Sequence, residues 1–235
     1  MLTVAHKQPA LPVIASALIG LFLAAAPASG DPCAEPELED PQIYVVFNST
    51  DNDAQLIIAG AGGSAGGITA LSIDGPRGTV AIDAEFVDGR KLGQADFQFD
   101  TPEPSLAKLK RAYPAGLYQF SATTTSNCKL RSAIKLSYKL PSAPVIVFPM
   151  EGDTGVTSSG FTAFWQEIAD ADALRLAVED ENDGTALTVD LPGDATSFNV
   201  PGEFLKPGVL YTMDVIAISK TGNRTVTDVQ FTTGP

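Results

Sequence analysis

The sequence of 235 residues contains a single histidine, His6, and only two cysteines. His6 lies in an N-terminal segment that we expect to be removed, so the mature chain contains no histidine. Such a chain cannot run a Ser-His or Cys-His catalytic couple, and it lacks the commonest zinc ligand. Catalysis by a histidine couple is therefore excluded.

Basic residues are also few. The chain carries 15 Lys and Arg against 28 Asp and Glu, a net charge of −13 at pH 7. Loss of residues 1–30 would remove Lys7 and no acid, which leaves 14 basic against 28 acidic residues and a net charge of −14. Because phosphate contacts need clusters of Lys and Arg, we expect no binding to nucleic acid or to an anionic membrane. The acidity favours solubility outside the cytoplasm.

The first 30 residues have the pattern of a secretory signal peptide. Lys7 supplies a positive charge, residues 11–26 are nearly all apolar, and small residues follow up to Gly30. Cleavage after Ala28 or Gly30 fits this pattern, and we place the site after Gly30. An uncleaved anchor is the alternative, but the apolar run is shorter than the roughly 20 residues of a spanning helix and contains Pro12. We therefore expect a secreted or periplasmic protein whose mature chain has no membrane span.

Both cysteines, Cys33 and Cys128, remain after cleavage. In an oxidising compartment, an even pair predicts one disulfide. This bond would close a loop of 95 residues, and in the chain-entropy model such a closure stabilises the fold by about 4 kcal/mol. Two free thiols are the alternative.

The mature chain divides into two halves of domain size. Residues 31–41 form an acidic, proline-broken lead-in, and Pro141-Ser142-Ala143-Pro144 forms a short, stiff joint. We predict one domain over residues 42–141 and a second over residues 142–235. The predicted fold class is all-β, with two tandem β-sandwiches.

The second half shows the pattern of seven short strands separated by turn residues. Inward-facing residues are expected to alternate along these strands: Phe161, Ala163, Trp165, Leu174, Leu176, Val178, Leu187, Val189, Leu191, Phe198, Val200, Val229 and Phe231. A Pro-Gly turn leads to Tyr211, which opens a strand with Met213, Val215 and Ala217 on one face. A Tyr at such a corner buries its ring and bonds its hydroxyl to nearby backbone.

This half resembles a fibronectin type III domain over Pro144 to Thr233. The matching residues are Trp165, the corner Leu205-x-Pro207-Gly208-x-x-Tyr211, and Ala217. The resemblance implies a β-sandwich, and it does not imply integrin-type adhesion. The adhesive Arg-Gly-Asp tripeptide of that family is missing, because the corresponding hairpin contains Lys220-Thr221-Gly222-Asn223-Arg224.

The first half is less regular. Strands are expected over residues 43–47, 56–59, 68–73, 117–123 and 130–140, with one short helix over residues 104–111. Pro114 precedes Tyr118 by four residues, as Pro207 precedes Tyr211. We interpret this half as a diverged immunoglobulin-like sandwich, with a chance Pro-Gly-Tyr turn as the alternative.

Over residues 42–235 the chain is similar to a group of secreted bacterial proteins that contain a fibronectin type III domain. The matching segments are Pro114-Ala115-Gly116-Leu117-Tyr118-Gln119-Phe120 and Leu136-Ser137-Tyr138-Lys139-Leu140-Pro141. This resemblance implies no catalytic residue.

Three segments contain residue types that occur in binding sites. Asp51 and Asp53, near Asn48, offer oxygen ligands to calcium, and an ordinary Asx turn is the alternative. Residues 180–184 are expected to form a hairpin turn rather than a calcium loop, because the spacing of an EF-hand is not kept. The glycine-rich residues 60–67 are followed by a strand pattern instead of a helix, so we expect a loop rather than a phosphate site.

The sequence therefore predicts an exported, non-enzymatic interaction or structural module. It would bind a protein or a carbohydrate through sandwich loops or a sheet edge. No catalytic, cofactor-binding or metal-binding residue is assigned. One alternative is a calcium-assisted carbohydrate- or surface-binding module. A remoter alternative is a hydrolase whose carboxylates come from both domains and meet at the joint.

Overall fold

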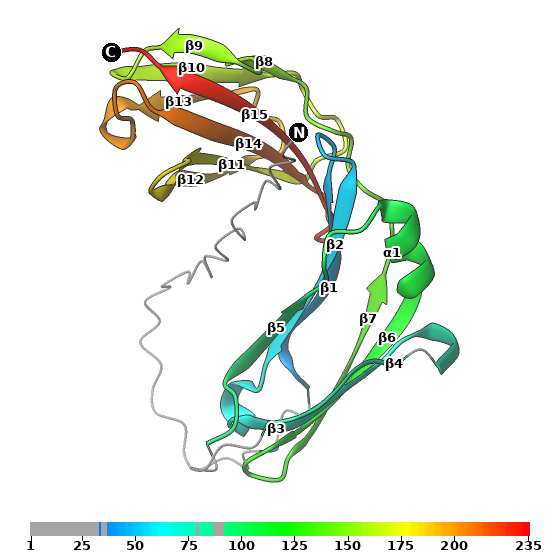
Figure 1. The fold of residues 1–235 in the computed structure, drawn as a ribbon. Helices are drawn as coiled ribbons and strands as arrows, with labels where there is room; N and C mark the ends of the chain where they lie inside the picture. The colour runs from blue at the N-terminus through cyan, green and yellow to red at the C-terminus, as the bar shows by residue number, and fades with distance from the viewer. Residues whose placement is uncertain (1–32, 34–36, 79, 87–91) are drawn as a thin grey trace, which may run out of the picture. The chain divides into compact units, whose positions relative to one another are not determined.

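The computed structural model describes residues 33, 37–78, 80–86 and 92–235 (Figure 1). The described residues all belong to one unit, Asp31–Pro235. The predicted signal peptide and its cleavage site fall outside the described residues, so they stay predictions.

Among its described residues, the first half of this unit contains seven strands and one α-helix. The strands are β1 (Glu39–Asn48), β2 (Asp53–Ala61), β3 (Ile68–Asp74), β4 (Val80–Glu85), β5 (Asp96–Asp100), β6 (Gly116–Thr124) and β7 (Lys129–Leu136), and the helix is α1 (Leu106–Ala112). The five predicted strands and the helix are present. Strands β4 and β5 were not expected, and β7 ends at Leu136 although the expected strand continued to residue 140.

The second half consists of strands joined by turns. They are β8 (Ile146–Phe148), β9 (Asp153–Val156), β10 (Gly160–Trp165), β11 (Ala173–Asp180), β12 (Gly184–Pro192), β13 (Ser197–Pro201), β14 (Leu210–Ile218) and β15 (Arg224–Thr233). Single 3-10 turns lie at Gly63–Ala65, Pro76–Gly78 and Gly202–Phe204. The seven expected strands are present, and β9 is an additional short strand.

The strands form three sheets, named here A, B and C. Sheet A has eight strands in the order β12-β11-β14-β15-β1-β2-β5, with β9 also paired to β15. Sheet B has the order β4-β3-β6-β7, and sheet C has the order β13-β10-β8. Within sheet A, β1 runs parallel to β15 over Val46–Asn48 and Arg224–Val226, so one sheet continues from the second half into the first.

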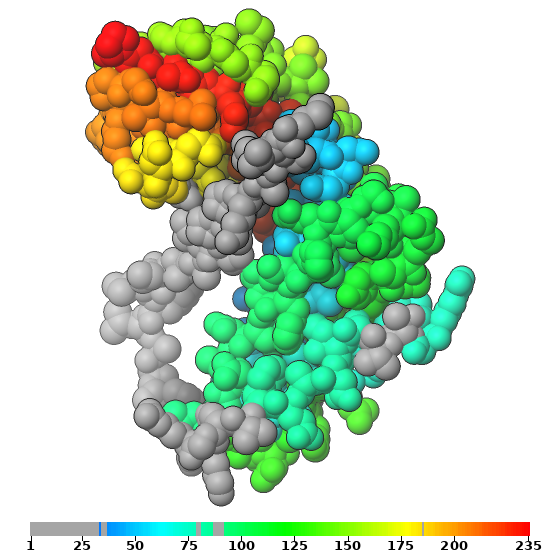
Figure 2. Space-filling model, in the orientation of Figure 1, coloured from blue at the N-terminus to red at the C-terminus, as the bar shows by residue number. Residues whose placement is uncertain are grey.

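Each half has its own hydrophobic core. The first core combines β1, β2 and β5 of sheet A with sheet B and α1, and it includes the fully buried Leu56, Ile73 and Phe120. The second core lies between sheet C and the other strands of sheet A, around Trp165, Leu176 and Phe231. Figure 2 colours these two stretches of chain from blue to green and from green to red.

Both predicted tyrosine corners are present. The side chains of Tyr211 and Tyr118 are 0 % exposed. The Tyr211 hydroxyl accepts a 2.8 Å hydrogen bond from the backbone N–H of Lys206, and the Tyr118 hydroxyl donates a 3.1 Å bond to the Pro114 carbonyl. Each bond fixes the turn before a central strand to the core of its own sandwich.

The fold class is all-β, with sandwich sheets, as the sequence predicted. In the second half a three-stranded sheet faces the four strands β12-β11-β14-β15, an arrangement typical of a fibronectin type III-like fold. The division between residues 141 and 142 stays a prediction.

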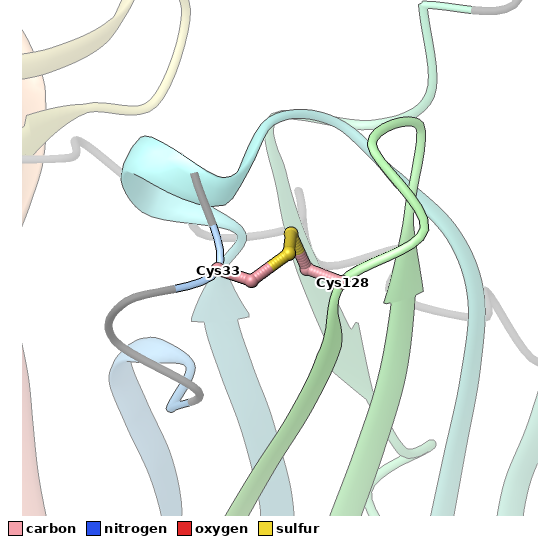
Figure 3. Close-up of a disulfide and its surroundings, with 2 residues drawn as sticks. All are labelled: Cys33 and Cys128. Carbon is pink, nitrogen blue, oxygen red and sulfur yellow. A yellow bond between two sulfur atoms is a disulfide. The ribbon is translucent and has the colours of Figure 1, made fainter. Parts of the chain in front are cut away.

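The predicted disulfide between Cys33 and Cys128 is also present (Figure 3). Its Cα atoms are 5.3 Å apart, and Cys128 is 2 % exposed at the edge of the first core. The bond ties the N-terminal lead-in to the turn between β6 and β7.

Candidate functional site

A hollow of about 360 Å³ lies on the outer face of sheet B. All four strands contribute to it, and we call it the trough. The side chains on this face are Ala70, Ser72, Asp83, Glu85, Ser121, Thr123, Lys129 and Arg131. The alternate residues, such as Leu71 and Leu130, are buried in the first core and contribute backbone to the trough.

Strand register arranges the trough in two parallel rows. In one row Glu85 lies opposite Ala70, Ala70 opposite Thr123, and Thr123 opposite Lys129. In the next row the order is Asp83, Ser72, Ser121 and Arg131. Each row therefore runs from an acid on β4 across two small side chains to a base on β7.

The two walls of the trough carry opposite charge. Asp83 and Glu85 are exposed on one edge strand, and Lys129 and Arg131 are exposed on the other. The Lys129 ammonium donates a 2.7 Å hydrogen bond to the Thr123 hydroxyl, which holds its charge over the floor. Among the described residues, no ion pair joins the two walls.

The second feature is the joint between the halves, centred on Asn223. This side chain is 1 % exposed. Its Oδ1 accepts a 2.9 Å hydrogen bond from the backbone N–H of Val45, and its Nδ2 donates to the carbonyls of Ser137 and Lys139 at 3.0 and 3.2 Å. One buried amide therefore satisfies backbone groups of β1 and of the segment after β7.

Further contacts surround Asn223. The Thr225 hydroxyl donates a 2.7 Å bond to the Pro141 carbonyl, and the Ser49 N–H donates a 2.8 Å bond to the Val226 carbonyl. The Arg224 guanidinium lies 4.6 Å from the centroid of the Tyr44 ring, within the range of a cation–π interaction. Polar, aromatic and backbone groups of both halves thus contact one another at the joint.

The third feature is a buried acid on the solvent side of sheet A. Asp214 lies directly opposite Asp228 in the β14–β15 ladder, and its side chain is 7 % exposed. No hydrogen bond or ion pair reaches its carboxyl within the described part of the chain. Burial, with the charges of Glu179 and Asp228 next in importance, raises the pKa of Asp214 to about 7. One oxygen of Asp228 is also buried without a hydrogen-bond partner.

Carboxylates of the two halves influence one another here. Burial and the charges of Glu103, Asp51 and Asp228 raise the pKa of Asp53. Hydrolysis of a glycoside needs two carboxyl groups that face each other across an accessible cleft. The acids around Asp53 and Asp214 do not form such a cleft with the acids of the trough. The trough lies on another sheet, and Asp214 is almost completely buried.

Asp51 lies in a turn that is held by hydrogen bonds of Asn48, and Asp53 opens β2 directly after this turn. The Asn48 side-chain oxygen accepts hydrogen bonds from the backbone N–H groups of Thr50 and Asp51 at 2.8 and 3.3 Å, which is the geometry of an Asx turn. In the described residues, no group of three or more potential ligands is placed to hold a metal ion.

The other segments singled out in the sequence have structural roles. Asp180 is 4 % exposed and accepts hydrogen bonds from Asn182 and Asp183 in the hairpin turn, and its bond with the Lys206 ammonium lowers its pKa. Residues 60–67 pass through one 3-10 turn into β3, so no helix follows them. Trp165 is buried in the second core, and its Nε1 donates to the Ala195 carbonyl at 2.8 Å.

Sequence reasoning missed both Asn223 and the charged walls of the trough. Asn223 has the signal of an ordinary turn residue, because it follows Thr221-Gly222. The walls become visible only once the register of four strands is known. No signal in the sequence marks the joint, because the pairing of β15 with β1 is known only once the chain is folded.

No protein-family model matches the chain. Similar solved structures include the FN1–FN3 domains of chicken CNTN1, with 13 % identity, 86 % of this chain and 69 % of that chain covered, and a TM-score of 0.34. A two-domain fibronectin type III segment of chicken tenascin has 16 % identity, coverages of 84 % and 97 %, and a TM-score of 0.32. The fibronectin(III)-like modules of Clostridium thermocellum CbhA have 9 % identity, coverages of 84 % and 93 %, and a TM-score of 0.34. No residue role is transferred from these chains.

Proposed function

We propose that the protein is an exported, non-enzymatic interaction or structural module. In this proposal two β-sandwiches are held in a fixed relation and together present binding surfaces. The observation that carries it is the buried Asn223 amide, which bonds to β1 and to the segment after β7 at the point where sheet A continues from one half to the other.

A joint of this kind favours a module that holds its binding surfaces in a fixed arrangement over one whose halves move independently. Opening it would exchange several protein hydrogen bonds for bonds to water, at a net cost of roughly 0.5–1.5 kcal/mol for each bond. Two domains connected only by a mobile linker carry no such cost when they move. The joint therefore supports a module whose surfaces keep constant positions while it binds a protein or a carbohydrate.

The proposed location is extracellular or periplasmic, in a secreted bacterial protein of the fibronectin type III-containing group. The disulfide supports this location, because disulfides persist in oxidising compartments. Within the described residues, no helix is long and apolar enough to cross a membrane.

The proposed binding surface is a sheet face rather than a loop or a sheet edge. The trough has the size of small ligand sites, which occupy roughly 300–1,000 Å³, and it carries charged groups on two sides. Loops and sheet edges stay the alternative location.

The experiment is a binding survey in which the labelled wild-type protein is applied to peptide and glycan arrays. Asn223→Ala, which removes the central amide of the joint, is measured on the same arrays for comparison. Specific, saturable binding with every compound recovered unchanged by mass spectrometry would support a non-enzymatic interaction module. Cleavage of any arrayed compound, lost in an Asp214→Asn or Asp228→Asn variant, would contradict it and favour the hydrolase.

A further inference from the structure

The floor of the trough is open and polar. Its central side chains are Ala70, Ser72, Ser121 and Thr123, none larger than a threonine. The three hydroxyl groups can donate and accept hydrogen bonds, and the small volumes leave room for the backbone of a ligand. Aromatic side chains are missing from the described lining, so the stacking platform that neutral sugars commonly use is not offered.

The charged groups of the two walls lie on opposite sides of the floor and form no ion pair with each other in the described chain. Strands in a sheet lie about 4.8 Å apart, so three spacings place the axes of β4 and β7 about 14 Å from each other. Neither Asp83 nor Glu85 has an ion-pair partner within the described chain, and the same holds for Arg131. A ligand that carries both charges would complement both walls at once.

The distance between the two walls determines the length of a matching ligand. An extended peptide advances about 3.4 Å per residue, so roughly four residues cover the distance between the walls. The free α-ammonium of such a peptide then reaches β4, and its α-carboxylate reaches the Lys129 ammonium, which extends over Thr123 of β6, and the Arg131 side chain. Arg131 provides the planar fork that binds a carboxylate through two parallel hydrogen bonds.

We propose that the trough binds a short dipolar peptide that lies across β3 and β6, with its ammonium group against Asp83 and Glu85 and its carboxylate against Lys129 and Arg131. The inference rests on the proposed function of the protein as an interaction module and names the ligand class of its surface.

The probe is tetra-alanine with free termini, titrated into the ¹⁵N-labelled protein and followed by the shifts of backbone amide signals. N-acetyl-tetra-alanine amide has the same chain without the two charges and is the matched control ligand. We expect saturable shifts confined to sheet B with tetra-alanine and none with the control. Because the charges are exposed, binding should weaken severalfold when salt is raised from about 20 to about 200 mM.

Two double variants test the walls, Asp83→Asn with Glu85→Gln and Lys129→Gln with Arg131→Gln. Each should weaken tetra-alanine binding by roughly fivefold to tenfold, because one end of the ligand loses its charged partners. The exposed Asp96→Asn on β5 is the control and should bind as the wild type does. A quadruple variant, D83R, E85K, K129E and R131D, exchanges the two ends of each row, keeps the net charge and should bind the peptide in reverse with an affinity close to that of the wild type.

Equal binding of the blocked peptide, shifts outside sheet B, or no shift with about 20 mM tetra-alanine would each overturn the proposal. So would wall variants that bind as tightly as the wild type. A well-dispersed spectrum shows that a variant is folded, so loss of binding is not confused with unfolding. These failures would leave the module function standing, because that function is decided by the array survey and not by tetra-alanine.

Discussion

Asp214 is expected to make the fold less stable as the pH rises. Its side chain is 7 % exposed, and burial with the nearby charges of Glu179 and Asp228 raises its pKa from 3.8 to about 7. Between these two pH values the folded chain holds a proton that the unfolded chain has released. The stability is therefore complete below the unfolded pKa and decreases as the pH rises through the folded pKa.

The size of the effect follows from the two pKa values. One pKa unit corresponds to about 1.4 kcal/mol, so a rise from 3.8 to about 7 gives a loss of at most about 4 kcal/mol by about pH 8. The acids with lowered pKa values, Asp170, Asp180 and Asp190, titrate below 3.8 and act outside this window. Asp53, with its raised pKa, contributes in the same direction as Asp214.

The perturbation is Asp214→Asn, which keeps the shape and removes the charge. Its amide can donate a hydrogen bond to the buried, unpartnered oxygen of Asp228. We expect the variant to be more stable than the wild type by up to about 4 kcal/mol at about pH 8, and nearly equal to it at about pH 4.

The assay is urea unfolding at several pH values, followed by tryptophan fluorescence of Trp165. Asp194→Asn removes an exposed acid from the loop after β12 and is the control, with no expected change in the pH profile. The reasoning would be refuted if the free energy of unfolding of the wild type were constant between about pH 5 and pH 8. A destabilisation of Asp214→Asn that is the same at every pH would also refute it.

Two further predictions concern the disulfide and the tyrosine corners. Cys33→Ser with Cys128→Ser should lower the free energy of unfolding by about 4 kcal/mol, because the bond closes a loop of 95 residues, and urea unfolding would show it. Alkylation of the wild type without reductant should label neither cysteine, and labelling of both would contradict the pairing. Tyr211→Phe should cost roughly 1–3 kcal/mol in thermal unfolding, because the buried ring loses the hydroxyl that accepts from Lys206. Tyr118→Phe should cost a similar amount, because it leaves the half-buried Pro114 carbonyl without its partner, and unchanged stability in either variant would contradict the role of the corners.

The tyrosine corners and the disulfide could be predicted because their signals are local or few in number. A Pro four residues before a Tyr defines the turn within one segment, and two cysteines permit only one pairing. The alternation of Leu174, Leu176 and Val178 likewise marks the face of a strand directly.

Strands β4 and β5 escaped prediction for a physical reason. Both are short edge strands, and β5 contains only two apolar residues, Phe97 and Phe99, between acids. Edge strands often carry charge that discourages pairing with other chains, so their sequence pattern is weak. These two strands form because β5 pairs with β2 and β4 pairs with β3, and the local sequence pattern does not show this pairing.

The joint and the trough depend on contacts between distant parts of the chain. Asn223 bonds to Val45, 178 residues away, and a turn motif gives no indication of that partner. The trough requires Asp83, Ser72, Ser121 and Arg131 to share one row, which depends on the register of three strand pairs. A shift of one residue in any pair would turn a charged wall into the core.

The most direct test of the central claim is a measurement of residual dipolar couplings on the wild type and on Asn223→Ala. Because the Asn223 amide joins the two halves, we expect the couplings of both cores in the wild type to fit one common alignment tensor. In Asn223→Ala each core should keep its own couplings while the two require separate tensors. Separate tensors in the wild type, or one shared tensor that survives in Asn223→Ala, would contradict the account.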